Sequence, residues 1–161
     1  GISGELALRG QPNRPFTKGQ RTFNRLVGKI ETLRAALARE TRRLDEALAY
    51  VKSLGARADS MAHYTVGVAC FEKVRNDKEQ LIGPEQRMVI VDAGIEALRK
   101  SVAMTPDSFD SLVYLNLVLR QKARLEVDPV VQQALIAEAV TLQDKARAIV
   151  AARKAKEAAA S

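Results

Sequence analysis

The stretch "GIEALRKSVAMTPDSFDSLVYLNLVLRQKA" (Gly94–Ala123) decides how the chain folds, because good helix formers stand on both sides of Pro106. A proline inside a helix removes a backbone hydrogen bond, so Pro106 either separates two packed helices or kinks one long helix. Small residues precede the proline, at Gly94, Ala97 and Ser101, and they let a second helix approach closely. A pattern of leucines follows it. The stretch therefore favours packed antiparallel helices over a kinked rod.

The composition of the whole chain predicts an all-α protein. Ala, Leu, Arg, Glu and Lys dominate the 161 residues, and β-branched runs bounded by turns are missing. Hydrophobic residues make up 47% of the chain, which is enough to build a core. The longest nearly apolar run, at residues 111–119, is less than half of the roughly 20 residues that a membrane span needs. We therefore expect one helical domain with an extension and no membrane span.

Start and stop signals divide the chain into five helices that follow a flexible arm at residues 1–16. The sequence "TKGQ" is a capping box that begins a long helix, and Gly55 ends that helix. Caps and prolines begin the later helices at residues 59–60, 84, 107–108 and 128–129. We expect the second helix to run on to residue 82, the third to end near 104 and the fourth near 125.

The first helix, over residues 17–55, is basic and amphipathic. Residues 1–55 contain 11 Lys and Arg against 5 Asp and Glu, whereas residues 56–161 contain 15 against 14. The apolar seam has steps of three and four residues, a heptad pattern typical of coiled coils and broken only by Glu40. It runs through Leu26, Ile30, Leu33, Leu37, Glu40, Leu44, Ala47 and Val51. Two roles stay open for this helix: it covers one end of the helical domain, or it pairs with a second copy in a homodimer.

Two segments carry a family resemblance. "GIEALRKSVAMTPDS" resembles the second helix of a tetratricopeptide repeat (TPR) with its closing proline, and "FDSLVYLNLVLRQKA" resembles a TPR first helix. Asn116 stands where that helix usually has Gly or Ala. "MAHYTVGVACF" resembles an earlier first helix, and the end of the chain is similar to the end of bacterial TPR proteins. The resemblance covers about residues 59–156.

The resemblance implies TPR-like antiparallel hairpins over residues 56–161. Two hairpins are fewer than the three repeats that usually bury a continuous core, so a further helix must cover the open end. The fifth helix has the apolar stripe of such a C-terminal cap, which consists of Val130, Leu135, Ile136, Ala139, Leu142, Ala146 and Ile149.

The resemblance also implies a binding site, because the first helices of TPR proteins line a groove that often holds an extended peptide. Three arginines there would hold a carboxylate. The Lys/Asn carboxylate clamp of chaperone-tail binders is missing. As an alternative, the first or fifth helix fills the groove and makes the residues part of the core. The predicted partner-binding residues are Tyr64, Phe71, Arg75, Asp110, Val113, Leu117, Arg120 and Arg124, flanked by Met61 and Val68.

The sequence argues against an enzyme. His63 is the only histidine, and the chain has neither a CxxC nor an HExxH pattern nor a Gly-rich phosphate loop. Cys70 is the only cysteine, and we expect it to be a small buried hydrophobe. We therefore expect a non-enzymatic scaffold or adaptor that binds a protein or peptide, with no cofactor and no metal.

The basic first third gives an alternative function. Its lysines and arginines could contact nucleic-acid phosphates or an anionic membrane surface, or the helix could serve a purely structural assembly subunit. The sparing use of cysteine favours the cytoplasm. A periplasmic location stays open, because the chain begins with Gly and its N-terminus looks trimmed.

Overall fold

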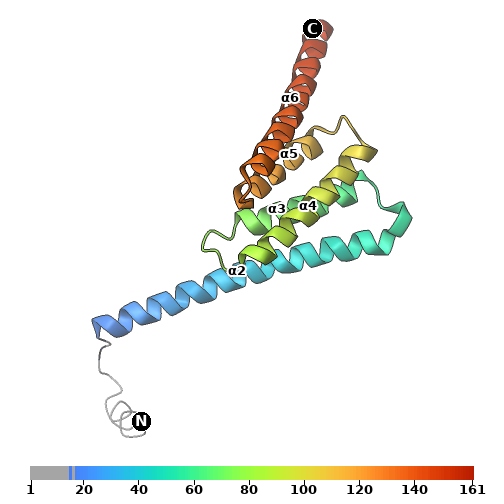
Figure 1. The fold of residues 1–161 in the computed structure, drawn as a ribbon. Coiled ribbons are helices and arrows are strands. Elements are labelled where there is room, and N and C mark those ends of the chain that lie inside the picture. The colour runs from blue at the N-terminus through green and yellow to red at the C-terminus, as the bar shows by residue number, and fades with distance from the viewer. Residues whose placement is uncertain (1–14, 16) are drawn as a thin grey trace. The chain divides into compact units, whose positions relative to one another are not determined.

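A computed structural model describes residue 15 and residues 17–161 of the chain (Figure 1). Apart from Pro15, the expected flexible arm lies outside the described residues. The described part contains helices and no strand, which confirms the predicted all-α class. Its elements are α2 (Lys18–Leu54), the short 3₁₀ helix η1 (Gly55–Arg57), α3 (Ser60–Arg75), α4 (Pro84–Met104), α5 (Phe109–Leu125) and α6 (Pro129–Ala160). None of these helices is long and apolar enough to cross a membrane.

Local side-chain chemistry sets the helix ends. The capping box is confirmed: the backbone N–H of Gln20 donates to Thr17 Oγ1 at 3.1 Å, and the N–H of Thr17 donates to Gln20 Oε1 at 2.9 Å. Gly55, at the end of α2, has a φ of 56°, a left-handed conformation that favours glycine. The predicted caps of the later helices are also confirmed, since backbone N–H groups donate to the side chains of Asp59, Ser108 and Asp128.

The prediction that the second helix continues to residue 82 is wrong, because α3 ends at Arg75. Asp77 is the physical reason. Its carboxylate accepts the backbone N–H groups of Leu81 (2.9 Å) and Ile82 (2.8 Å), and it also accepts a hydrogen bond from Arg87 Nη2 at 2.6 Å. These bonds fold residues 76–83 into a compact loop in which Gln80 has a φ of 55°. A local side-chain to backbone pattern has replaced the helical one.

The chain divides into two units, residues 1–36 and residues 37–161, and the division falls inside α2. In the second unit, the C-terminal part of α2 packs antiparallel to α3, because Asn76 Nδ2 donates to Glu40 Oε1 at 3.0 Å and Arg43 pairs with Glu72. Leu44 and Ala47 are buried there. The compact unit thus begins at residue 37, inside the helix over residues 17–55 that was predicted as a separate segment. Glu40, which breaks the heptad, accepts the hydrogen bond from Asn76, the residue that follows α3.

Consecutive helices α3, α4 and α5 pack antiparallel to one another. Ser60 of α3 bonds to Ser101 of α4, while Arg87 near the start of α4 reaches Val74 near the end of α3. Gly67 and Gly94 permit this close approach. A Cβ atom added at Gly67 would lie 2.3 Å from Leu98 Cγ, and one at Gly94 would lie 2.9 Å from Cys70 Cβ. The small residues therefore let the helices approach closely, as expected.

A line of hydroxyl groups joins the three helices at one end. Ser60 Oγ donates to the backbone carbonyl of Ser101 at 3.0 Å, and the hydroxyls of Ser60 and Ser101 lie 2.8 Å apart. The hydroxyls of Ser101 and Ser111 lie 2.7 Å apart, and Ser108 Oγ donates to Ser111 Oγ at 3.2 Å. Ser101 and Ser111 are buried. These bonds satisfy polar groups that would otherwise be costly to bury.

α6 packs on α5 and closes the C-terminal side of the second unit. Its buried residues are Ala139, Leu142 and Ala146, and Arg99 of α4 forms a two-pronged ion pair with Glu138. The stripe expected for a capping helix is therefore only partly correct. Leu135 and Ile149 contact the core, but Val130 and Ile136 are exposed, Val130 at 73%.

Candidate functional site

α3 and α5 run parallel to each other and share one face. Aromatic rings connect them: the centroids of Tyr64 and Tyr114 lie 5.6 Å apart, and so do those of Phe71 and Tyr114. Both pairs are edge-to-face, the favourable arrangement for aromatic rings. Pockets lie at the two ends of this aromatic cluster, one at the carboxyl ends of the two helices and one at their amino ends.

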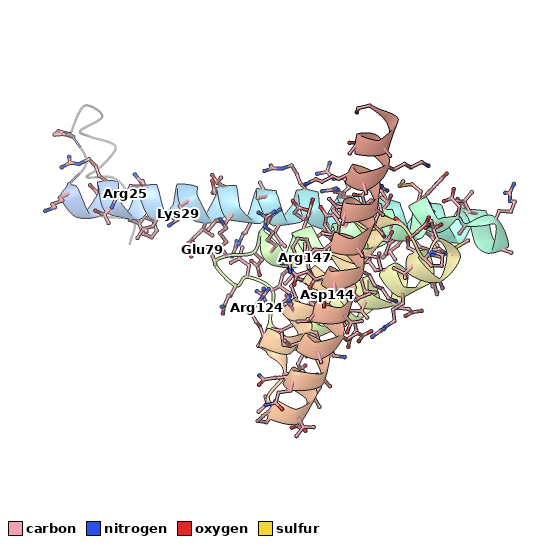
Figure 2. The ribbon with its side chains drawn as sticks, turned by 90° about the horizontal axis from the view of Figure 1, so that it is seen from above. Arg25, Lys29, Glu79, Arg124, Asp144 and Arg147 are labelled. Carbon is pink, nitrogen blue, oxygen red and sulfur yellow. The ribbon has the colours of Figure 1, made fainter. Side chains whose placement is uncertain are left out.

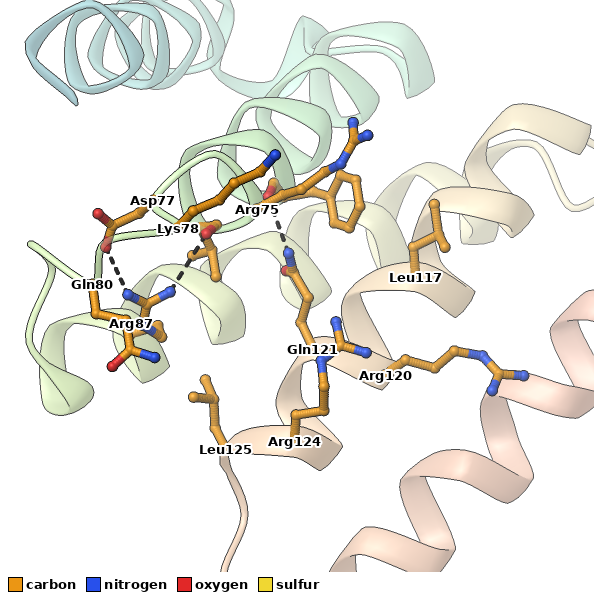
Figure 3. A pocket seen from close by; sticks show the side chains of 12 residues that line it. Arg75, Asp77, Lys78, Gln80, Arg87, Leu117, Arg120, Gln121, Arg124 and Leu125 are labelled. Atoms are coloured by element: carbon orange, nitrogen blue, oxygen red, sulfur yellow. Dashed lines mark hydrogen bonds and ion pairs between the residues drawn. The ribbon is translucent and has the colours of Figure 1, made fainter. Parts of the chain in front are cut away.

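The first, which we call the basic pocket, has a volume of about 440 Å³ (Figure 3). Five cationic side chains and one carboxylate line it, which gives the lining a net charge of +4. Four apolar and two amide side chains complete the wall. The lining residues are Phe71, Val74, Arg75, Asp77, Lys78, Gln80, Arg87, Leu117, Arg120, Gln121, Arg124 and Leu125.

The cations of the basic pocket differ in what holds them. Arg87 is bonded to Asp77 and to the carbonyls of Val74 and Ile82. Arg120 donates to Asn116 Oδ1 at 2.8 Å and to Gln143 Oε1 at 3.3 Å. Within residues 17–161, no hydrogen bond or ion pair of the side chains of Arg75, Lys78 or Arg124 is present. These three charges are available to an anionic partner.

Gln121 forms a polar point in the pocket wall. It is only 4% exposed, and its Nε2 donates to the backbone carbonyl of Phe71 at 3.0 Å (Figure 3). Its Oε1 atom has no hydrogen-bond partner. A buried acceptor without a donor costs about 1–3 kcal/mol, so this atom lowers the stability of the fold.

The second, which we call the methionine pocket, has a volume of about 470 Å³. Met61 and Met104, both largely exposed, lie in its wall with Tyr64. Asp59 and Asp110 give it two carboxylates and it has no cationic residue, so its charge is opposite to that of the basic pocket. Burial and, secondarily, the Asp110 carboxylate raise the pKa of Tyr64, so its hydroxyl stays protonated at neutral pH.

The structure places seven of the eight predicted partner-binding residues in the two pockets. Tyr64 and Asp110 line the methionine pocket, and Val113 lies half-buried against the core without lining either. The other five, Phe71, Arg75, Leu117, Arg120 and Arg124, line the basic pocket. Phe71 is 9% exposed and belongs to the core, whereas Arg75 and Arg124 are exposed.

Several residues of the pockets were missed by the sequence reasoning, among them Lys78, Met104 and Gln121. Lys78 was missed because its segment was expected to be helical. Met104 ends α4, where antiparallel packing brings it beside the start of α3. Gln121 could have been found, because it lies four residues after Leu117 and three before Arg124, on the same side of α5.

The two residues that nucleophilic or metal chemistry would use are poorly placed for it. Cys70 is fully buried, and this burial raises the pKa of its thiol to about 11. The thiol is therefore protonated and inaccessible at neutral pH. His63 lies half-buried in α3. Among the residues that the structure describes, no three His, Cys, Asp or Glu side chains come together as metal ligands would.

In the first unit, the described residues form the N-terminal part of α2. Lys18, Arg21, Arg25 and Lys29 follow one another at spacings of three and four residues and so share one side of the helix; Arg25 and Lys29 are labelled in Figure 2. Exposed Phe23, Leu26, Val27 and Ile30 share the other side. This part of the helix is amphipathic.

Comparison of the chain with protein-family models, with curated proteins and with solved structures found no match. The TPR resemblance therefore stays a prediction that rests on the quoted segments. Conclusions about function rest on the two pockets and on the first unit.

Proposed function

We propose that the protein is a non-enzymatic interaction module whose α3–α5 face binds an extended segment of a partner protein. The observation that carries the proposal is the opposite charge of the two pockets at the ends of this face. The basic pocket offers the unpaired Arg75, Lys78 and Arg124, and the methionine pocket offers Asp59 and Asp110. A complementary partner segment is therefore acidic at one end and basic at the other.

Apolar contacts supply the middle of this binding face. Tyr64 and Phe71 connect the two pockets through Tyr114, and Val113 and Leu117 of α5 lie half-buried beside them. Rigid aromatic side chains bury large apolar area at low entropic cost, which makes the half-buried Tyr64 and Tyr114 good anchors for a partner, whereas Phe71 belongs to the core and supports them from below. The central residues of the segment would then be apolar.

Helix geometry sets the length of the segment. Asp110 and Arg124 are 14 residues apart on α5, which corresponds to about 21 Å along the helix axis. An extended chain advances about 3.3 Å per residue, so six or seven residues span the face.

The test uses fluorescein-labelled heptapeptides with blocked ends and the full chain, with binding measured by fluorescence anisotropy. The first peptide has two lysines, three leucines and two glutamates in that order. The second has the same composition with its charges alternating. We expect the first to bind about five-fold more tightly, because only it matches both pockets. Equal affinity would show that the pockets do not act together, and binding of neither would remove the proposal.

Charge-reversal variants locate the site. Arg124→Glu and Asp110→Lys should each weaken binding of the first peptide about five- to ten-fold, because each places a like charge beside one end of the peptide. Arg147→Glu and Asp144→Lys reverse exposed charges on α6 that line neither pocket, and they serve as matched controls (Figure 2). Equal losses in the control variants would indicate binding through net charge alone.

A further inference from the structure

The N-terminal part of α2, residues 18–36, has an exposed apolar side. Phe23 is 66% exposed, Leu26 51% and Ile30 46%, and Val27 lies beside them. With Leu33 they lie at spacings of three and four residues and form one stripe. A run of exposed apolar side chains on one helix face is typical of a surface that contacts another protein or a membrane.

The opposite side of this segment is basic. Residues 18–36 contain five Lys and Arg, of which Lys18, Arg25 and Lys29 share that side. Glu31 is the only acidic residue of the segment. The net charge of the segment is +4, which favours an anionic partner. An apolar stripe opposite a basic side is the pattern of a helix that lies in a membrane interface, with its apolar side among acyl chains and its lysines and arginines near headgroups.

The charges disfavour the obvious rival, a second copy of the chain. With Ile30 and Leu33 at core positions of a heptad, Lys29 and Arg34 are the flanking residues that face each other across a parallel pair, and both are positive. The exposed seam also extends over only about two heptads, fewer than the three or four that indicate a coiled coil.

Nucleic acid fits this segment less well than a lipid surface does. Phosphate contacts would use Lys18, Arg25 and Lys29 but would leave Phe23 and Ile30 in water. A lipid interface uses both sides of the helix. The described segment has 19 residues, about 28 Å of helix, which is long enough to lie along such a surface.

We propose that residues 18–36 bind the surface of an anionic membrane as an interfacial helix. The apolar stripe supplies burial, and the basic side selects lipids with negative headgroups. This binding is independent of the peptide-binding face of α3 and α5, because it uses none of the residues of either pocket.

The test is cosedimentation of the full chain with vesicles of phosphatidylcholine containing 30% phosphatidylserine, and with vesicles of pure phosphatidylcholine. We expect at least ten-fold tighter binding to the anionic vesicles, and weaker binding at high salt. The Phe23→Glu/Ile30→Glu variant should lose at least ten-fold in affinity, because it places charges in the apolar stripe. The Val89→Glu/Val130→Glu variant is the matched control, since it changes two exposed apolar residues of the other unit, and it should bind like the unchanged chain.

Three results would overturn the proposal. The first is equal binding to both kinds of vesicle or to neither. The second is binding to duplex DNA or RNA that depends on Arg25 and Lys29 but not on Phe23 and Ile30. The third is a dimer in sedimentation velocity that Phe23→Glu/Ile30→Glu dissociates while vesicle binding is absent. Circular dichroism of each variant should show unchanged helix content and melting temperature. A loss of binding then cannot be attributed to unfolding of the variant.

Discussion

The two faces of α3 differ in how tightly the next helix covers them. On the face toward α4, Gly67 sits against Leu98, and Cys70 sits against Gly94, with Cys70 and Leu98 fully buried. On the face shared with α5, Tyr64 and Phe71 meet Tyr114 edge-on, and the two pockets remain at the ends. Both faces belong to the same 16-residue helix.

The difference shows that side-chain size on one helix can set both a closed contact and an open one. Glycines let backbones approach until no space remains, whereas aromatic rings hold neighbouring helices apart and leave space beyond their edges. Stability should therefore depend mostly on the α4 face, and binding mostly on the α5 face. The following substitutions test this division, from the largest expected effect on stability to the smallest.

Gly67→Ala should produce the largest loss, about 3 kcal/mol of unfolding free energy, because the added Cβ would lie within 2.8 Å of three carbons of Leu98. Leu98 is fully buried and cannot move away. Urea unfolding followed by circular dichroism measures the loss. Gly28→Ala is the matched control in α2: no atom lies within 4 Å of its added Cβ, so better helix propensity should leave stability unchanged or slightly higher. Equal effects of the two substitutions would contradict close packing at Gly67.

Asp77→Ala should cost about 2 kcal/mol, because it removes the acceptor for two backbone N–H groups and for Arg87. The loss is smaller than at Gly67, since Arg87 keeps the carbonyls of Val74 and Ile82 as partners. Loop 76–83 should also exchange its amide hydrogens faster. Glu79→Ala, in the same loop and exposed, should change neither quantity.

Raising the pH should destabilise the α4 face through Cys70. The folded-state pKa of this thiol is raised to about 11 from 9.0. The stability that the buried, protonated thiol contributes is therefore fully present below pH 9 and is lost as the pH rises toward 11. Between pH 8 and pH 10 we expect a loss of about 1 kcal/mol from this group. Comparing the urea midpoints of the chain and of Cys70→Ala over this range isolates the effect. A loss of the same size in Cys70→Ala would assign it to other groups, such as Tyr64, whose pKa is also raised.

Gln121→Leu should have the smallest effect on stability, less than about 1 kcal/mol. It removes the hydrogen bond to the Phe71 carbonyl, but it also removes the unpartnered Oε1, and these terms offset each other. Peptide binding should change little, because the Oε1 atom is buried and offers no acceptor to a partner. A large loss of stability in thermal unfolding would show that these two terms do not offset each other.

Much of the fold could be predicted because its signals are local. The helix caps at Asp59, Ser108 and Asp128 can be recognised from the residues next to them. The close helix contacts are marked by Gly67 and Gly94. The loop after Arg75 could not be predicted, since residues 78–81 are good helix formers. Their helical state is overcome by the carboxylate of Asp77, which bonds to two N–H groups of the loop and to Arg87 of the next helix.

The candidate site was predicted in part for the same reason. Residues of α5 such as Leu117, Arg120 and Arg124 are three or four positions apart, so the sequence alone predicts that they lie next to one another on one face of the helix. Lys78 and Met104 join the pockets only through contacts between segments distant in sequence, which spacing along one helix does not encode. Phe71 was expected to face a partner but belongs to the core, because Tyr114 and the end of α5 cover it.

The line of serine hydroxyls has a built-in direction. Each hydroxyl has a single proton, and that of Ser60 goes to the carbonyl of Ser101. Ser101 must then donate to Ser60, Ser111 to Ser101, and Ser108 to Ser111. Three of the O–H dipoles therefore point from the cap of α5 through α4 to the start of α3, and the fourth, that of Ser60, points back to the Ser101 carbonyl of α4. Shifting any one of these helices along its axis by one turn would break these hydrogen bonds as well as the packing. The serine hydroxyls therefore fix the position of the three helices along their axes.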